Sequence, residues 1–174
     1  MLKRIATALL VTILIAPTAA LGQTRRRSTK PPASSQATAQ KTAAARTAGA
    51  TKVAEQIKLI SKFIYLLGGV ASGIAAVDEA VKKNEASPAV VQSNQQSKAI
   101  VKKGFQDFRE SLDRLETEFR NQPELQPFYI KLAGSAAGAA KAEEQAAAGQ
   151  YDAGGRTLLT VINRLADVLV IMRQ

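Results

Sequence analysis

Carboxylates are the principal side chains through which this chain could perform acid–base or metal chemistry. Its 174 residues contain neither cysteine nor histidine. These absences exclude covalent c-type haem attachment, thiolate or imidazole metal sites and the nucleophile–base pairs built on histidine. Glu143 and Glu144 are adjacent on an alanine-rich segment, where we expect both to be solvated. The sequence therefore predicts a protein that is not an enzyme and that binds no cofactor or metal.

Asp78 is the acidic residue with the most informative position. It falls on the apolar seam of a predicted helix, where a charged side chain is unusual. A buried aspartate there would pair with a lysine or arginine of a neighbouring helix and fix the helix register. Alternatively, Asp78 contacts a ligand inside the bundle, or it lies near the helix end and reaches water. From the sequence we favour the last interpretation.

Two glycine pairs have the small-x-x-x-small spacing that lets helices approach closely. Gly69 and Gly73 form the first pair, and Gly134 and Gly138 form the second. Glycine weakens an isolated helix by about 1 kcal/mol relative to alanine, so we expect a close contact to compensate. The two pairs predict that the first and third helices pack backbone to backbone.

The uncharged run over residues 63–77 offers a second interpretation of the first glycine pair. Such a run could insert into a membrane as a dimerising segment. However, Lys62 and Asp78 bracket it, and a helix needs about 20 apolar residues to span a bilayer. We therefore favour packing within a bundle.

Six aromatic residues recur at helical spacing: Phe63, Tyr65, Phe105, Phe108, Phe128 and Tyr129. Together they could line a pocket for a small apolar ligand, which would make the protein a carrier. Aromatic side chains at this spacing more often fill a helical core, because each buries a large apolar area. We retain the carrier as an alternative function.

Alternating steps of three and four residues predict a first helix from Val53 to near Asn84. Its seam comprises Val53, Ile57, Ile60, Ile64, Leu67, Ala71, Ile74 and Val81. A second stripe on the same helix comprises Leu59, Phe63, Leu66, Val70 and Val77. A helix that is apolar over so much of its circumference should be largely buried. This first helix, with its extra apolar stripe, is the expected contact surface if the bundle self-associates.

The second and third helices are less sharply bounded. The second is clearest from Val101 to Phe119, and its start is open because residues 92–98 are polar on all sides. The third runs through Leu132 towards Ala148 and is rich in alanine and glycine.

Gly149 is a natural terminator for the third helix, and Asp152 is a natural N-cap for the fourth. The fourth helix has an apolar face that continues to the C-terminal end of the sequence. Four helices with short connections predict an all-α fold, an antiparallel up-down four-helix bundle over residues 52–174.

Residues 1–22 have the three parts of a secretory signal peptide: a cationic start, an apolar run over residues 5–15, and small residues before Gln23. Cleavage after Ala20 is the second choice. The apolar run is shorter than the roughly 20 residues that span a bilayer. The sequence therefore predicts a secreted or periplasmic protein.

Arg25, Arg26 and Arg27 follow this apolar run. Positive charge near the end of a hydrophobic segment resists translocation, so an uncleaved membrane anchor is an alternative. An acid-free stretch rich in Arg, Ser, Thr and Ala also resembles an organelle transit peptide, which would apply if the source were an alga or plant.

The net charge of +10 is unevenly distributed along the chain. Residues 23–52 hold seven basic side chains and no acidic one, whereas the chain beyond residue 52 holds 15 basic and 14 acidic side chains. Residues 23–51 lack large apolar side chains, which predicts a disordered basic linker, although its alanines could allow a transient helix towards Lys52. The linker also lacks the aromatic side chains that stack on bases, so we expect no nucleic-acid partner. A weak contact with anionic envelope components is expected instead.

The sequence as a whole predicts an exported, non-enzymatic helical bundle that acts through a protein partner, self-association or the envelope. A membrane-anchored bundle and a carrier of a small apolar ligand are the alternatives. The candidate interaction residues are Arg25, Arg26, Arg27, Gly69, Gly73, Asp78, Gly134 and Gly138.

Overall fold

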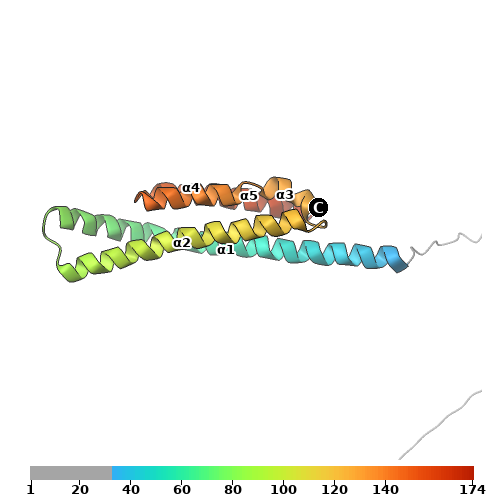
Figure 1. Cartoon of the computed structure of the whole chain (residues 1–174), viewed down its shortest axis with the longest axis horizontal. Helices are drawn as coiled ribbons and strands as arrows, with labels where there is room; N and C mark the ends of the chain where they lie inside the picture. The colour runs from blue at the N-terminus through green and yellow to red at the C-terminus, as the bar shows by residue number, and fades with distance from the viewer. Residues whose placement is uncertain (1–32) are drawn as a thin grey trace, which may run out of the picture. The chain divides into compact units, whose positions relative to one another are not determined.

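The structure is a computed structural model that describes residues 33–174 (Figure 1). Its helices are α1 (Ala33–Lys82), α2 (Pro88–Asn121), α3 (Gln126–Leu132), α4 (Ser135–Ala147) and α5 (Tyr151–Met172). The described residues contain no β-strand, so the predicted all-helical fold is confirmed. The proposed signal peptide and the three consecutive arginines, Arg25, Arg26 and Arg27, lie outside the described residues.

The four long helices pack around one core. α1 and α4 each contact both α2 and α5, and the short α3 lies against α2 and α5. The largest fully buried apolar side chains are Val53, Ile60, Phe105, Leu112, Phe119, Leu125, Leu132, Leu158, Leu165 and Val168. Each long helix therefore has two main helical neighbours and one side that faces solvent.

A short turn connects α1 to α2. Asn84 has a positive φ of 58°, which an asparagine adopts more readily than most residues and which stops α1 close to the predicted end. The Ser87 hydroxyl caps α2 by accepting a hydrogen bond from the Val90 amide, and Pro88 occupies the first turn. Residues 92–98, whose conformation was open from the sequence, are therefore helical.

The first helix begins far earlier than the predicted boundary at residue 52. α1 starts at Ala33, so the structure contradicts the predicted disorder over residues 33–51. Alanine has the highest helix propensity, and Lys, Arg and Gln are also good helix formers. Residues 36–44 are exposed, but Gly49 is buried against Leu125 and Met172. The composition argument failed because a segment without large side chains can still extend a docked helix.

The predicted third helix is broken in two. Gly134 has a φ of +89° and separates α3 from α4. The guanidinium of Arg164 donates to the freed carbonyl of Ala133 at 2.5 Å. The Glu116 carboxylate accepts a hydrogen bond from the Ala136 amide at 2.8 Å and so satisfies the start of α4. Tertiary hydrogen bonds therefore replace the helical ones lost at the break.

The connection from α4 to α5 confirms one prediction and corrects another. Gly149 has a φ of +78° and ends α4, as its residue type predicts. Gln150 is the N-cap residue of α5, and Asp152 lies within the first turn. The prediction that Asp152 caps α5 is therefore wrong, although its charge still complements the positive end of the helix dipole.

Candidate interaction surface and polar cluster

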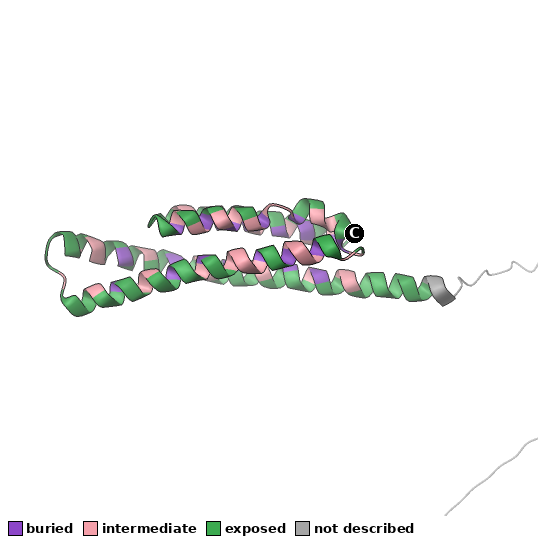
Figure 2. Ribbon diagram, viewed as in Figure 1, coloured by how far each residue is buried: buried purple, intermediate pink, exposed green. Residues whose placement is uncertain are grey.

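The second apolar stripe of α1 is largely exposed (Figure 2). Leu59, Leu66 and Val70, which we call the outer stripe, are 53%, 54% and 40% exposed. They recur at steps of seven and four residues and so share one face of the helix. The predicted burial of this stripe is wrong, because α1 has two main neighbours and this face contacts neither fully. The next residue along the chain, Leu67, is buried on the core side.

Two members of the second stripe, Val77 and Phe63, are partly buried. Phe63 packs against aromatic side chains of α2. Its ring lies 5.1 Å from the rings of both Phe105 and Phe108, in edge-to-face arrangements. Gly104 on α2 leaves room for this ring, since a Cβ there would lie 2.5 Å from Phe63 Cε2. Phe63 therefore holds α1 against α2, while its stripe neighbours stay exposed.

The apolar surface continues from α1 onto α2. A groove between the two helices is lined by Val70, Gly73, Ile74, Val77, Val90, Ser93, Asn94 and Ser97. Val90 on α2 is exposed at this groove, and Ile100 on the same helix is 72% exposed. The outer stripe is thus part of a wider apolar surface on α1 and α2.

The glycine pairs do not pack α1, which contains Gly69 and Gly73, against α4, which follows Gly134. A Cβ at Gly69 or Gly73 would meet no atom within 4 Å, so both glycines are open. A Cβ at Gly138 would lie 2.8 Å from Cγ2 of Val161, and Gly134 lies beside the guanidinium of Arg164. The predicted backbone-to-backbone packing is therefore wrong, since the second pair faces α5.

Asp78 accepts two hydrogen bonds from α2. Its Oδ1 lies 2.7 Å from Asn94 Nδ2 and 2.6 Å from Lys98 Nζ. Asn94 is buried, and the Asp78 side chain is partly exposed. Of the three interpretations from the sequence, the pairing with a lysine of a neighbouring helix is found. The interpretation that we favoured, a carboxylate near the helix end that reaches water, describes the partial exposure of Asp78 but not its bonds to Asn94 and Lys98.

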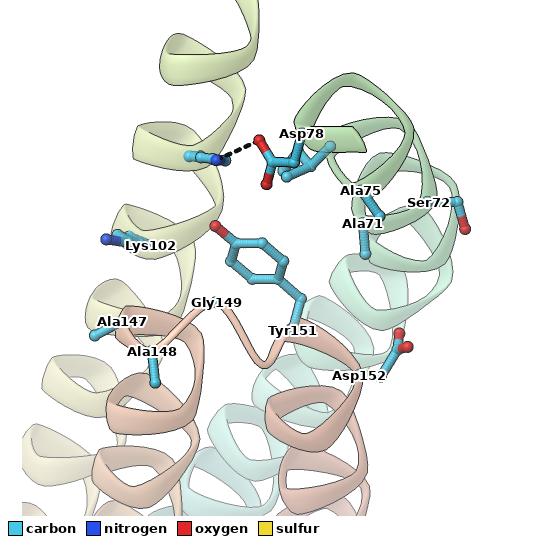
Figure 3. Close-up of a pocket in the computed structure, with 12 residues that line it drawn as sticks. Ala71, Ser72, Ala75, Asp78, Lys102, Ala147, Ala148, Gly149, Tyr151 and Asp152 are labelled. Carbon is cyan, nitrogen blue, oxygen red and sulfur yellow. Dashed lines mark hydrogen bonds and ion pairs between the residues drawn. The ribbon is translucent and has the colours of Figure 1, made fainter. Parts of the chain in front are cut away.

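Tyr151 follows the turn from α4 to α5, and its hydroxyl points towards Asp78 (Figure 3). A pocket of about 470 Å³ lies there, between the turn and the helices α1 and α2. Its polar lining includes Asp78, Lys98, Lys102 and Tyr151, and small alanine side chains form much of the rest. Burial raises the pKa of the Tyr151 phenol, the nearby Lys98 ammonium acts in the opposite direction, and Asp78 adds to the rise.

Asn94, Lys98 and Tyr151 were not identified from the sequence. Phe105 and Val101 are four residues apart on the core face of α2. Lys98 lies three residues before Val101, and Asn94 lies four residues before Lys98. The core-facing spacing therefore continues through the polar stretch, and this signal could have identified two members of the cluster. Tyr151 follows the Gly149 turn, and no periodic pattern marks it.

The other predicted groups are dispersed. Glu143 is partly buried and accepts a hydrogen bond from Arg109 Nε at 2.6 Å, so only Glu144 is the solvated carboxylate that we expected. Tyr65 is 85% exposed. Phe128 packs under the Arg46 guanidinium, and Tyr129 lies near Arg120. The six aromatic side chains therefore do not line one shared pocket.

One helix among the described residues, α1 between Gln36 and Lys82, could cross a membrane by length and composition alone. This criterion is weak, because the core helix of a soluble protein satisfies it too. Ile60, Leu67 and Ile74 of α1 are buried against other helices. One side of α1 therefore packs in the core of the bundle, and another side is exposed to solvent.

No cluster of three or more carboxylates that could hold a metal ion occurs in the part of the chain that the structure describes. Comparison with protein-family models, with curated proteins and with solved structures gives no match for this chain.

Proposed function

We propose that this protein is an exported, non-enzymatic, up-down four-helix bundle that acts by binding through α1. In this proposal the signal peptide over residues 1–22 is removed before Gln23. The basic residues Arg25, Arg26 and Arg27 precede α1 in the sequence and add positive charge to this part of the chain. The protein is then secreted or periplasmic, and it binds a protein partner, a second copy or the envelope.

The exposed outer stripe is the observation that carries this proposal. Single exposed apolar side chains are normal on soluble proteins and need no explanation. Leu59, Leu66 and Val70, in contrast, share one face, and Val70 also lines the groove between α1 and α2. Exposed apolar side chains gathered on one face are typical of an interaction site.

Cell fractionation tests the export step. Cells that express the full chain are fractionated, the membranes are washed with alkaline carbonate, and the intact mass of the product is measured. We expect a soluble species that begins at Gln23. Retention of the first 22 residues in a soluble cytoplasmic product would contradict export.

A membrane-anchored bundle is the second candidate, favoured by the length and composition of α1 and by the apolar run over residues 5–15. In this case the full-length mass would survive the carbonate wash in the membrane fraction. Insertion of residues 63–77 would remove Leu67 and Ile74 from the core, so an uncleaved N-terminal segment is the preferred form of this candidate.

A further inference from the structure

We infer that the outer stripe of α1 binds the surface of an anionic lipid bilayer as a peripheral contact. The inference rests on the proposed function and deepens it, because it names the envelope component that α1 meets. Three observations support it: the apolar side chains that α1 exposes, the positive charges beside them, and the packing of the rest of α1 against other helices.

The exposed apolar side chains have the sizes and types that enter the interfacial region of a bilayer. Leu59, Leu66 and Val70 lie on one face, and such faces enter the boundary between headgroups and acyl chains. Tyr65, which precedes Leu66 in the chain, is 85% exposed, and Ile100 on α2 is 72% exposed. Tyrosine is enriched at membrane–water interfaces because its ring is apolar and its hydroxyl is polar.

The charges on α1 complement an anionic surface. Over residues 33–77, the helix carries five Lys or Arg side chains and one acid, Glu55. Two of the five, Lys41 and Lys52, already pair with Glu124 and Glu118. Lys62 follows Leu59 by three residues and precedes Leu66 by four, so it lies on the same side of the helix. Lys58 and Lys62 are exposed, and within the described residues neither has a carboxylate partner. Both ammonium groups are therefore available to lipid phosphates.

The same charges disfavour a second copy as the occupant. Pairing two α1 helices through their outer stripes would bring Lys58 and Lys62 of both copies into one interface. No acidic side chain lies on α1 between Glu55 and Asp78, and Asp78 is already bound to Asn94 and Lys98. A bilayer with anionic headgroups supplies the missing negative charge.

The packing indicates a helix that lies on the bilayer and does not cross it. Ile60, Leu67 and Ile74, which lie on the side of α1 next to the outer stripe, are buried against the other helices. Only one side of the helix can therefore enter lipid without unfolding the bundle. One-sided apolar exposure with basic flanks is the pattern of an interfacial helix.

Vesicle flotation tests the inference. The full chain, as processed by the expressing cell, is mixed with vesicles of phosphatidylglycerol and phosphatidylcholine, or of phosphatidylcholine alone. We expect binding to the anionic vesicles that weakens in high salt. The double variant L66D/V70D should bind at least about tenfold more weakly. The variant K58Q/K62Q should bind on the order of twentyfold more weakly, since each lysine near an anionic surface contributes about fivefold.

The matched control is L159D/V170D, which adds the same two charges at exposed apolar positions of α5. It should bind the anionic vesicles within about twofold of the parent, and circular dichroism should show that every variant is folded. Equal binding by L66D/V70D and the control would overturn the inference, as would equal binding to both vesicle types. A lipid-free dimer detected by light scattering and abolished by L66D/V70D would instead assign the surface to a second copy.

Failure of this inference is distinguishable from failure of the proposed function. If the product is exported and cleaved before Gln23 but does not bind the anionic vesicles, only the inference fails. If the full-length chain stays in carbonate-washed membranes, export with cleavage fails, whichever variant is used.

Discussion

Lys98 on α2 places its ammonium nitrogen 2.6 Å from Oδ1 of Asp78 on α1, and the same oxygen accepts a hydrogen bond from the buried Asn94 amide. This contact joins the two helices close to the turn between them. Polar pairs at helix interfaces specify register in some proteins. In this chain the pair lies beside Tyr151, where α5 begins (Figure 3).

Replacing Asp78 by alanine should destabilise the fold by about 1–3 kcal/mol, because the Asn94 amide and the Lys98 ammonium both lose their acceptor. Urea-induced unfolding measures the change. The control is Lys103→Ala, which removes an exposed pair with Asp107 and should cost less than about 1 kcal/mol. Equal effects of the two substitutions would show that the Asp78 contacts contribute no more than a surface ion pair.

The neighbouring residues Leu66 and Leu67 provide a test of which stripe folds the bundle. Leu67→Ala should cost about 2–5 kcal/mol, because it leaves a cavity in the core. Leu66→Ala removes the same atoms from an exposed position and should change the free energy of unfolding by less than about 1 kcal/mol. Thermal or urea unfolding of the two variants gives the comparison. A larger loss for Leu66→Ala would mean that the outer stripe is covered.

Two glycines respond oppositely to substitution by alanine. A Cβ at Gly154 would lie 3.0 Å from the carbonyl oxygen of Ala142 and 2.9 Å from the ring of Phe105. Overpacking of this kind costs about 1–3 kcal/mol, so Gly154→Ala should lower the melting temperature. Gly69 faces open space, and Gly69→Ala should stabilise α1 by up to about 1 kcal/mol. A stabilising Gly154→Ala substitution would show that α4 and α5 are not closely packed there.

Tyr151 should make the fold less stable at high pH. Its pKa is raised in the folded state, first by burial. The unfolded chain therefore releases the phenol proton at lower pH, near about 10, and stability falls as pH rises beyond that value. Unfolding measured from pH 8 to pH 11 should show a smaller loss for Tyr151→Phe than for the parent. A difference ultraviolet titration between the parent and Tyr151→Phe should show that the Tyr151 phenol ionises above the ordinary tyrosine pKa of about 10. Ionisation of Tyr151 at or below that value would contradict the shift.

The local sequence predicts much of the secondary structure. The stop signals at Gly149 and near Asn84 act through backbone conformations that these residue types favour, and both are found in the structure. Propensity alone could also have indicated the early start of α1, since residues 33–51 are rich in alanine. The prediction of disorder rested on the absence of large apolar side chains, which does not prevent an alanine-rich segment from extending a packed helix.

The polar contacts were harder to predict. Asp78 was identified by its place on a seam, but its partners Asn94 and Lys98 lie on another helix. The break at Gly134 likewise depends on Arg164 and Glu116, which are distant in sequence and supply its hydrogen bonds. Such partners cannot be read from the sequence, because the spacing of apolar residues describes each helix separately and does not show which helices are neighbours.

The amino-acid sequence by itself determined that the described chain is helical, which residues form the seam through Ile60, Leu67 and Ile74, and where positive charge accumulates. These properties depend on local propensity, spacing and composition. Only the tertiary structure decided which of the two apolar stripes on α1 is buried. The two stripes look alike in sequence, and burial depends on the number and placement of neighbouring helices. With α2 and α5 as its main neighbours, α1 buries its seam and leaves Leu59, Leu66 and Val70 exposed.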